Sequence, residues 1–185
     1  MLTIIERNLD MSKFFYNGEN FWNEKVPPVS VEVIVKAEKM LGIKFPEEYT
    51  SLLKESNGGT LCYYYVDKEG FEEYRMQEMA GIDFENPEEG IFSFCDDIKE
   101  YSLPESIVIL AWETYPHSCF ALDYTHCTEN PPVVYFYENY PEEGIVYSKT
   151  IVAPTFKEFL KLLFYRPLLP PSQLKTSWKR ANKTE

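Results

Sequence analysis

The chain has 185 residues, enough for one domain, with 44% hydrophobic and 16% aromatic residues and a formal net charge of -12. This composition excludes a disordered chain, and the negative charge argues against direct binding to a phosphate backbone. The acids are concentrated, because residues 67–100 carry twelve acidic residues against three basic ones, a net -9. After Arg166 the sign reverses, with four basic residues against Glu185. Such a charge distribution attracts a basic partner, although acids also serve simply to keep a protein in solution.

The cysteines and the N-terminus bear on the cellular compartment. The four cysteines form no Cys-x-x-Cys pair and no dense framework, so reduced thiols are the simplest account. The first residues lack a basic start followed by an apolar stretch, and no apolar run approaches the eighteen or so residues that span a bilayer. We therefore expect a cytoplasmic protein.

The N-terminal part predicts a short extension and then an amphipathic helix. Residues 1–19 are aromatic and weakly patterned, and we expect one or two short helices there. Ser30 is a good N-cap, and Gly42 suits the left-handed residue that ends a helix. Between them, apolar residues recur at helical spacing and form one stripe: Val33, Ile34, Ala37, Met40 and Leu41.

A second helix and a turn follow directly. Pro46 suits the first helical position, and the two glutamates after it suit the positive end of the helix dipole. Asn57-Gly58-Gly59 ends this helix and turns the chain. Leu61–Val66 is rich in tyrosine and predicts a strand.

The second half of the chain predicts an antiparallel meander. Loops fill the acidic stretch, with a short strand or helix near residues 91–94 and 97–101. Turn signals containing Pro116 and Pro131-Pro132 then separate apolar runs of strand length. The expected strands, the last of them weakly marked, are Ile107–Trp112, Cys119–Tyr124, Val133–Tyr137 and Ile145–Ile151.

A closing helix completes the pattern. Thr155 and Glu158 form a capping box, in which each side chain reaches the other residue's free N–H, and apolar residues at helical spacing continue to Phe164. Because helices and strands are segregated, we predict an α+β fold with a central, mostly antiparallel sheet of about five to six strands flanked by helices. Its expected parts are an extension at 1–19, a domain at 20–166 and a basic tail at 167–185.

The segment Leu41–Gly59 carries a resemblance to a known family. It joins Leu41-Gly42, Phe45-Pro46, an acidic residue before Tyr49, and Asn57-Gly58-Gly59, in that order. This arrangement resembles the signature of the SUKH superfamily, and its nearest branch is similar to the Smi/Knr group, often described as regulators of cell-wall or glucan synthesis. Later segments fit as well, so the resemblance spans about residues 20–166.

The resemblance implies a mixed sheet flanked by helices, with no catalytic residues. We also expect no cofactor and no metal. Bacterial members resemble immunity proteins that bind and neutralise a toxin, often a nuclease, whereas fungal members resemble regulatory hubs of cell-wall signalling. This chain lacks the long flanks of the fungal hubs, so we expect a bacterial, non-enzymatic immunity protein. The alternative is a regulatory scaffold that binds a cellular enzyme. The oligomeric state stays open.

Other chemistries have weaker support in the sequence. His117, Cys119, His126 and Cys127 supply four potential zinc ligands, but they flank an expected strand instead of forming two tight knuckles. A Cys–His nucleophile pair would need a third, orienting group, and none is evident. Adjacent carboxylates such as Glu142-Glu143 are typical of solvated surface, whereas glycosidases need two carboxyls across a cleft.

The acidic stretch is the predicted binding surface. Aromatic residues are interleaved with its carboxylates, and aromatic anchors within a charged rim are typical of protein interfaces. The same aromatics would equally suit a core beneath loops. We expect a basic toxin domain as the partner, with these residues in contact with it: Glu69, Glu72, Glu73, Glu85, Glu88, Glu89, Asp96, Asp97 and Trp112.

Overall fold

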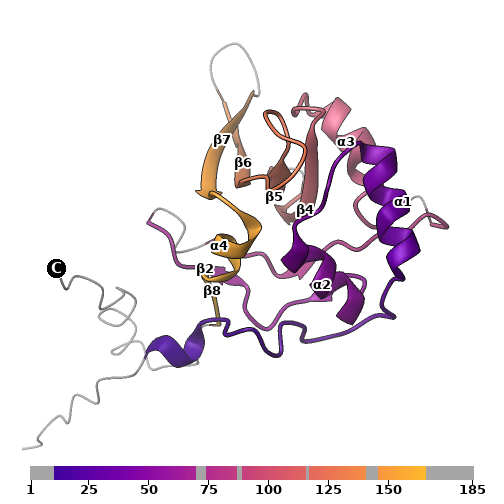
Figure 1. Ribbon diagram of the computed structural model, residues 1–185. Coiled ribbons are helices and arrows are strands. Elements are labelled where there is room, and N and C mark those ends of the chain that lie inside the picture. The colour runs from indigo at the N-terminus through magenta and orange to yellow at the C-terminus, as the bar shows by residue number, and fades with distance from the viewer. Residues whose placement is uncertain (1–10, 70–73, 87–88, 116, 141–145, 166–185) are drawn as a thin grey trace, which may run out of the picture.

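The computed structural model describes residues 11–69, 74–86, 89–115, 117–140 and 146–165 (Figure 1). Helical elements in this part of the chain are a 3-10 turn, η1 (Met11–Phe14), and the α-helices α1 (Val31–Leu41), α2 (Glu47–Glu55), α3 (Phe94–Glu100) and α4 (Phe156–Leu160). The strands are β1 (Gly59–Thr60), β2 (Tyr65–Val66), β3 (Glu78–Met79), β4 (Ile107–Thr114), β5 (Ser118–Asp123), β6 (Val133–Asn139), β7 (Val146–Ala153) and β8 (Leu163–Phe164). The fold is α+β, as the order of elements in the sequence predicts.

Helices α1 and α2 form where the sequence places them. The Ser30 hydroxyl accepts a hydrogen bond from the Val33 amide at 3.4 Å, and Gly42 ends α1 at a φ of 68°. These two features satisfy backbone groups that a helix end otherwise leaves unpaired. One boundary differs, because Pro46 has an extended ψ of 142° and is the capping residue, so α2 begins at Glu47.

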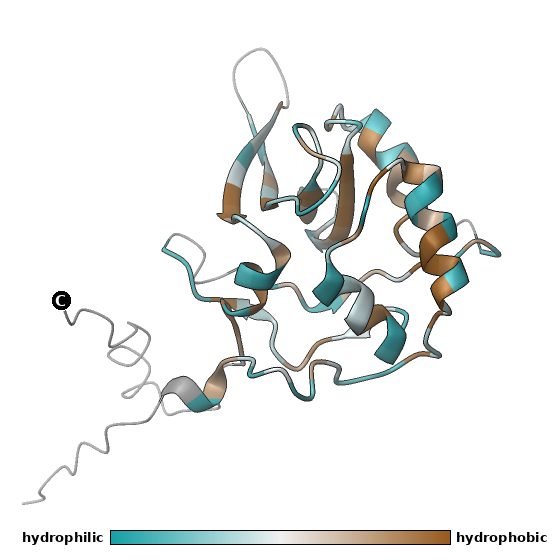
Figure 2. Ribbon diagram, viewed as in Figure 1, coloured by the Kyte–Doolittle hydropathy of each residue, from teal (hydrophilic) through white to brown (hydrophobic). Residues whose placement is uncertain are grey.

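The strands β4–β7 form one antiparallel sheet in sequence order, which is the predicted meander. Strand β5 and most of β4 are buried on both faces and mainly apolar, and β4 is largely brown in Figure 2, whereas β7 is partly exposed and contains polar residues. Alternate residues point to opposite faces. One face, which includes Phe120, joins the large core with α1, α2 and α4, while the other, which includes Cys119, packs beneath α3.

Four short strands form two separate pairs, β1 with β3 and β2 with β8. The Ala80 amide, directly after β3, donates to the Leu110 carbonyl at 2.8 Å, so the β1–β3 pair lies beside β4 while remaining a separate sheet. The single strand expected at Leu61–Val66 is not formed, because only Tyr65 and Val66 belong to a strand. Leu61 instead bridges Trp22, so this segment pairs with several partners in turn.

The closing helix is shorter than its apolar spacing predicts. The Thr155 hydroxyl accepts from the Glu158 amide at 3.2 Å, as expected of the cap, but the Glu158 carboxylate binds Lys161 at 2.6 Å and not the Thr155 amide. Helix α4 ends at Leu160, and the last two predicted helical residues form β8 against β2. Leu163 and Phe164 are buried in this strand, as they would be in a helix. Pairing with β2 therefore overrides the local helical pattern.

The chain ends lie largely outside the described residues. Residues 1–10 of the predicted extension and the whole basic tail from 167 onward belong to that undescribed part. Within the extension, η1 is followed by Phe15, which forms a bridge to Phe164.

Candidate functional site

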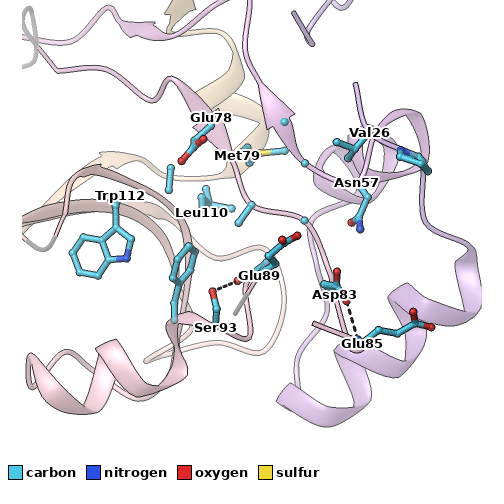
Figure 3. Close-up of a pocket in the computed structure, with 18 of the residues that line it drawn as sticks. Val26, Asn57, Glu78, Met79, Asp83, Glu85, Glu89, Ser93, Leu110 and Trp112 are labelled. Atoms are coloured by element: carbon cyan, nitrogen blue, oxygen red, sulfur yellow. Dashed lines mark hydrogen bonds between the residues drawn. The ribbon is translucent and has the colours of Figure 1, made fainter. Parts of the chain in front are cut away.

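A groove of about 910 Å³ lies between the β1–β3 pair, the segments at residues 80–86 and 89–93, and the C-terminal end of β4 (Figure 3). Its lining combines glycine backbone, carboxylates and aromatic rings. The lining residues used below are Asn57, Gly58, Gly59, Glu78, Met79, Ala80, Gly81, Asp83, Glu85, Glu89, Phe94, Trp112 and Tyr115.

The glycines in the floor of the groove allow two backbone segments to approach closely. Gly58 has a φ of +86°, and a Cβ atom there would lie 2.7 Å from both the Met79 carbonyl and the Gly81 amide nitrogen. A Cβ on Gly81 would lie 2.1 Å from the Asn57 carbonyl. Since real Cβ contacts are not this short, glycine is required at both positions.

Two polar side chains tie the same segments together. The Asn57 side chain donates to the Ile82 carbonyl at 2.9 Å and accepts from the Ile82 amide at 2.7 Å, as a backbone partner would. The Tyr49 hydroxyl, in a side chain without exposed surface, donates to the Ala80 carbonyl at 3.1 Å. Residues 49–59, which carry the family resemblance, therefore hold the floor of the groove in place.

Four carboxylates line this groove: Glu78, Asp83, Glu85 and Glu89. Glu78 lies on β3 and Glu89 faces the middle of the groove, while Glu85 lies at the outer margin in Figure 3. Among the described residues, none of the four forms an ion pair, whereas several surface carboxylates elsewhere are paired with lysines. No described lysine or arginine lines the groove either. The groove therefore carries uncompensated negative charge.

The Asp83 carboxylate has a structural role as well. Its Oδ1 accepts hydrogen bonds from the Asn86 and Glu85 amides at 2.9 and 2.8 Å. These bonds stabilise the ionised form and lower the pKa of Asp83 below its ordinary value. Asp83 therefore shapes the loop that carries Glu85 and contributes a fixed negative charge to the groove.

Aromatic rings form one end of the groove. The rings of Trp112 and Tyr115 lie 5.3 Å apart and nearly perpendicular, and Tyr115 is 60% exposed. The Tyr115 hydroxyl lies 3.4 Å from both the Asp97 carboxylate and the Tyr101 hydroxyl. The hydrogen bond with Tyr115, more than burial, raises the pKa of Tyr101 to about 12, so the Tyr101 hydroxyl remains neutral near pH 7. Exposed, rigid aromatic side chains next to carboxylates are suited to protein recognition.

The nine residues predicted from the acidic stretch do not form one surface. Glu85, Glu89 and Trp112 line the groove, and Asp97 reaches its edge through Tyr115. Asp96 points to solvent beside Lys99, and exposed Glu69 follows Lys68, which binds the β7 backbone away from the groove. The remaining three, Glu72, Glu73 and Glu88, lie outside the described residues.

The interleaved aromatics are divided between surface and core. Phe94 lines the groove, whereas Tyr74 packs on the Tyr135 ring at 4.7 Å. Phe84 and Phe92 lie 5.0 Å apart against the core. Phe71 lies outside the described residues.

Sequence reasoning missed Glu78, Asp83 and the Asn57-Gly58-Gly59 turn as groove residues. The turn was assigned a purely structural role, yet its backbone lines the groove. The sequence contained a signal for these groove residues. Gly58 and Gly81 indicate that two backbone segments approach closely, and Asp83 begins the turn that presents Glu85.

The cysteine and histidine candidates are placed elsewhere. Cys119 has no exposed surface, and burial raises the pKa of its thiol to about 12, so it is not ionised near pH 7. The His117 Nδ1 lies 2.6 Å from the Glu138 carboxylate, which also accepts from Tyr140. Within the described ranges, no three His, Cys, Asp or Glu residues converge as metal ligands.

The fold and the groove therefore define the class of protein: an α+β domain with a glycine-lined groove that is rich in carboxylates. None of the described helices is both long and apolar enough to cross a bilayer. Residues 28–162 match the SMI1 / KNR4 family (SUKH-1), which covers well over half of the chain. The protein therefore belongs to the SMI1 / KNR4 family, as the Leu41–Gly59 segment predicts. No curated protein matches the sequence.

Proposed function

We propose that this chain is a non-enzymatic protein-binding domain and, specifically, a bacterial immunity protein that acts in the cytoplasm by binding a cognate toxin and blocking its active site. The observation that carries the proposal is the groove, in which four carboxylates without described ion pairs stand beside the exposed Tyr115 ring and the half-buried Trp112 ring. A partner that supplies cations would relieve the repulsion among these carboxylates and cover the rings.

A nuclease is the kind of toxin that best fits this groove. A nuclease needs a basic surface to bind its phosphate backbone, and the same basic surface is complementary to Glu78, Glu85 and Glu89. Opposite charge would also speed the encounter, by tenfold or more at low ionic strength. The aromatic end, with Trp112 and Tyr115, supplies the large apolar contact that charge alone does not provide.

Charge reversal tests the proposal with the product of the adjacent gene as the candidate toxin. The variant Glu78→Lys, Glu85→Lys, Glu89→Lys should bind the toxin at least about 30-fold more weakly, because three contacts across the interface become repulsive. It should also fail to protect cells that express the toxin. Binding would be measured by titration calorimetry at two salt concentrations.

A matched control has the same change in net charge outside the groove. Glu69, Glu105 and Glu129 are exposed and do not line the groove, so replacing all three with lysine should change the affinity by less than about threefold. Equal losses in the two variants would contradict the placement of the site. A neighbouring gene without toxic activity, together with specific binding to a housekeeping enzyme, would contradict immunity and favour the scaffold alternative.

A further inference from the structure

We propose that the groove has a ligand within the same chain, namely the basic C-terminal tail, which competes with the partner for the carboxylates. The idea rests on the proposed function in one respect, since competition matters only if the partner binds in the groove. Docking of the tail needs only the groove and the tail.

The tail supplies the positive charges that the groove lining lacks. Residues 167–185 contain Lys175, Lys179, Arg180 and Lys183 against a single acid, and Trp178 stands among the cations. The groove presents four carboxylates next to exposed aromatic and aliphatic surface, including Val26, which is 44% exposed. An aromatic anchor flanked by cations is therefore complementary to the groove in both charge and hydrophobicity.

The groove differs from the rest of the described acidic surface because it gathers four carboxylates without ion pairs in one concave site. Elsewhere in the described chain, Glu55, Asp96 and Glu158 each lie within 4 Å of a lysine, and Asp123 binds Lys149 at 2.7 Å. Their charge is already compensated. The groove carboxylates have no such neighbour among the described residues, and a concave site allows several of them to act on one cation.

The tail starts close enough to the groove. From Tyr165, the last described residue, successive ring contacts lead through Tyr63, Tyr16 and Phe21 to Trp22, none longer than 6.3 Å between centroids. Trp22 in turn lies 3.7 Å from the Cβ position of a groove residue, Gly59.

The tail is also long enough to cover this path. Trp178 is the thirteenth residue after Tyr165, so an extended chain carries it roughly 43 Å at about 3.3 Å per residue. Arg180 reaches slightly farther. The tether raises the local tail concentration near the groove to the millimolar range, so even a weak contact is substantially occupied.

Carbodiimide cross-linking of the full chain tests the docking directly, because this reagent joins a lysine amine to a carboxylate only when they touch. We expect amide links from Lys175, Lys179 or Lys183 to Glu78 or Glu89, found by mass spectrometry. Raising the salt to about 1 M should reduce them several-fold, since it shortens the Debye length to about 3 Å. Mixing isotope-labelled with unlabelled protein should show that the links form within one chain.

The opposite results would overturn the proposal. Links to the exposed control acids Glu69, Glu105 and Glu129 at the same frequency would mean non-specific attraction. Links formed only between differently labelled copies would mean that a second molecule occupies the groove. The absence of any link from the tail lysines to the groove carboxylates would exclude docking.

A tail variant separates this proposal from the function. Replacing all four tail cations with glutamine in the full chain removes the competitor without adding negative charge, and should tighten partner binding by about two- to tenfold. If the links are specific but the groove charge reversal leaves partner affinity unchanged, the docking stands and the proposed partner site fails. If the reversal weakens partner binding, but the unaltered chain forms no links from the tail to the groove and the tail variant leaves the affinity unchanged, the partner site stands and the docking fails.

Discussion

Replacing Asn57 with alanine tests the architecture of the groove most directly. This side chain makes two hydrogen bonds to the backbone of Ile82, at 2.9 and 2.7 Å, across 25 residues of sequence. Ile82 is 3% exposed, so water cannot readily replace the missing partner at either its amide or its carbonyl. Each buried polar group left unpaired costs about 1–3 kcal/mol.

With two such groups, the expected loss in free energy of unfolding is about 2–6 kcal/mol. For a chain of this size such a loss lowers the melting temperature by roughly 6 °C or more. Urea denaturation monitored by circular dichroism would give the stability. Amide hydrogen exchange would give the local effect, because the Ile82 amide should lose protection before the sheet does.

Asn23→Ala is the matched control. Asn23 is exposed, and its side-chain nitrogen lies 3.5 Å from the Thr60 hydroxyl, at the limit of a hydrogen bond. The control should cost less than about 0.5 kcal/mol. A loss below about 1 kcal/mol for Asn57→Ala, or a loss equal to that of the control, would refute the conclusion that this side chain holds the groove floor.

Three further predictions concern a glycine, an ion pair and a thiol. Gly58→Ala should destabilise the fold by at least about 1 kcal/mol more than Gly42→Ala, because both have positive φ but only the Gly58 Cβ meets backbone atoms; equal denaturation midpoints would contradict this. Burial opposes ionisation of Asp123, but hydrogen bonds from Lys149 and the following turn outweigh it and lower its pKa. A lowered folded pKa adds stability above the ordinary value of 3.8 that is lost as the pH falls below it, so the deficit of Asp123→Asn, about 1–3 kcal/mol at pH 7, should shrink in acid; a deficit independent of pH would refute the assignment. The Cys119 thiol, with a pKa of about 12 and no exposed surface, should resist iodoacetamide at pH 8 until urea unfolds the chain, and mass spectrometry would reveal any earlier alkylation.

The helices α1 and α2 and the meander β4–β7 could be predicted because local physics determines them. Ser30 and Gly42 satisfy the ends of α1 with groups within the same segment, whatever the rest of the chain does. The strands of the meander are joined in sequence order, so each pairs with its neighbour along the chain. The order of these elements was enough to give the α+β class, and the residues of the Leu41–Gly59 segment indicated the family.

The short strands could not be predicted, because their partners are distant in sequence. Leu163 and Phe164 continue the helical spacing of α4, yet pairing with Tyr65 and Val66 makes them a strand. No residue within ten positions of Phe164 in the sequence indicates that Tyr65 and Val66 are its partners. Local propensity is a weak preference that a tertiary contact of this kind can override.

The candidate site also has features that the sequence determines and features that depend on the tertiary structure. The sequence by itself determined that negative charge and aromatic side chains are concentrated in residues 67–100, since composition needs no coordinates. Only the tertiary structure decided which of them act together: Glu85, Glu89 and Trp112 meet in one groove, while Asp96 does not. The physical reason is that the groove forms where the Asn57 turn packs on residues 79–82 and β4 ends beside them, a convergence of three segments separated along the chain.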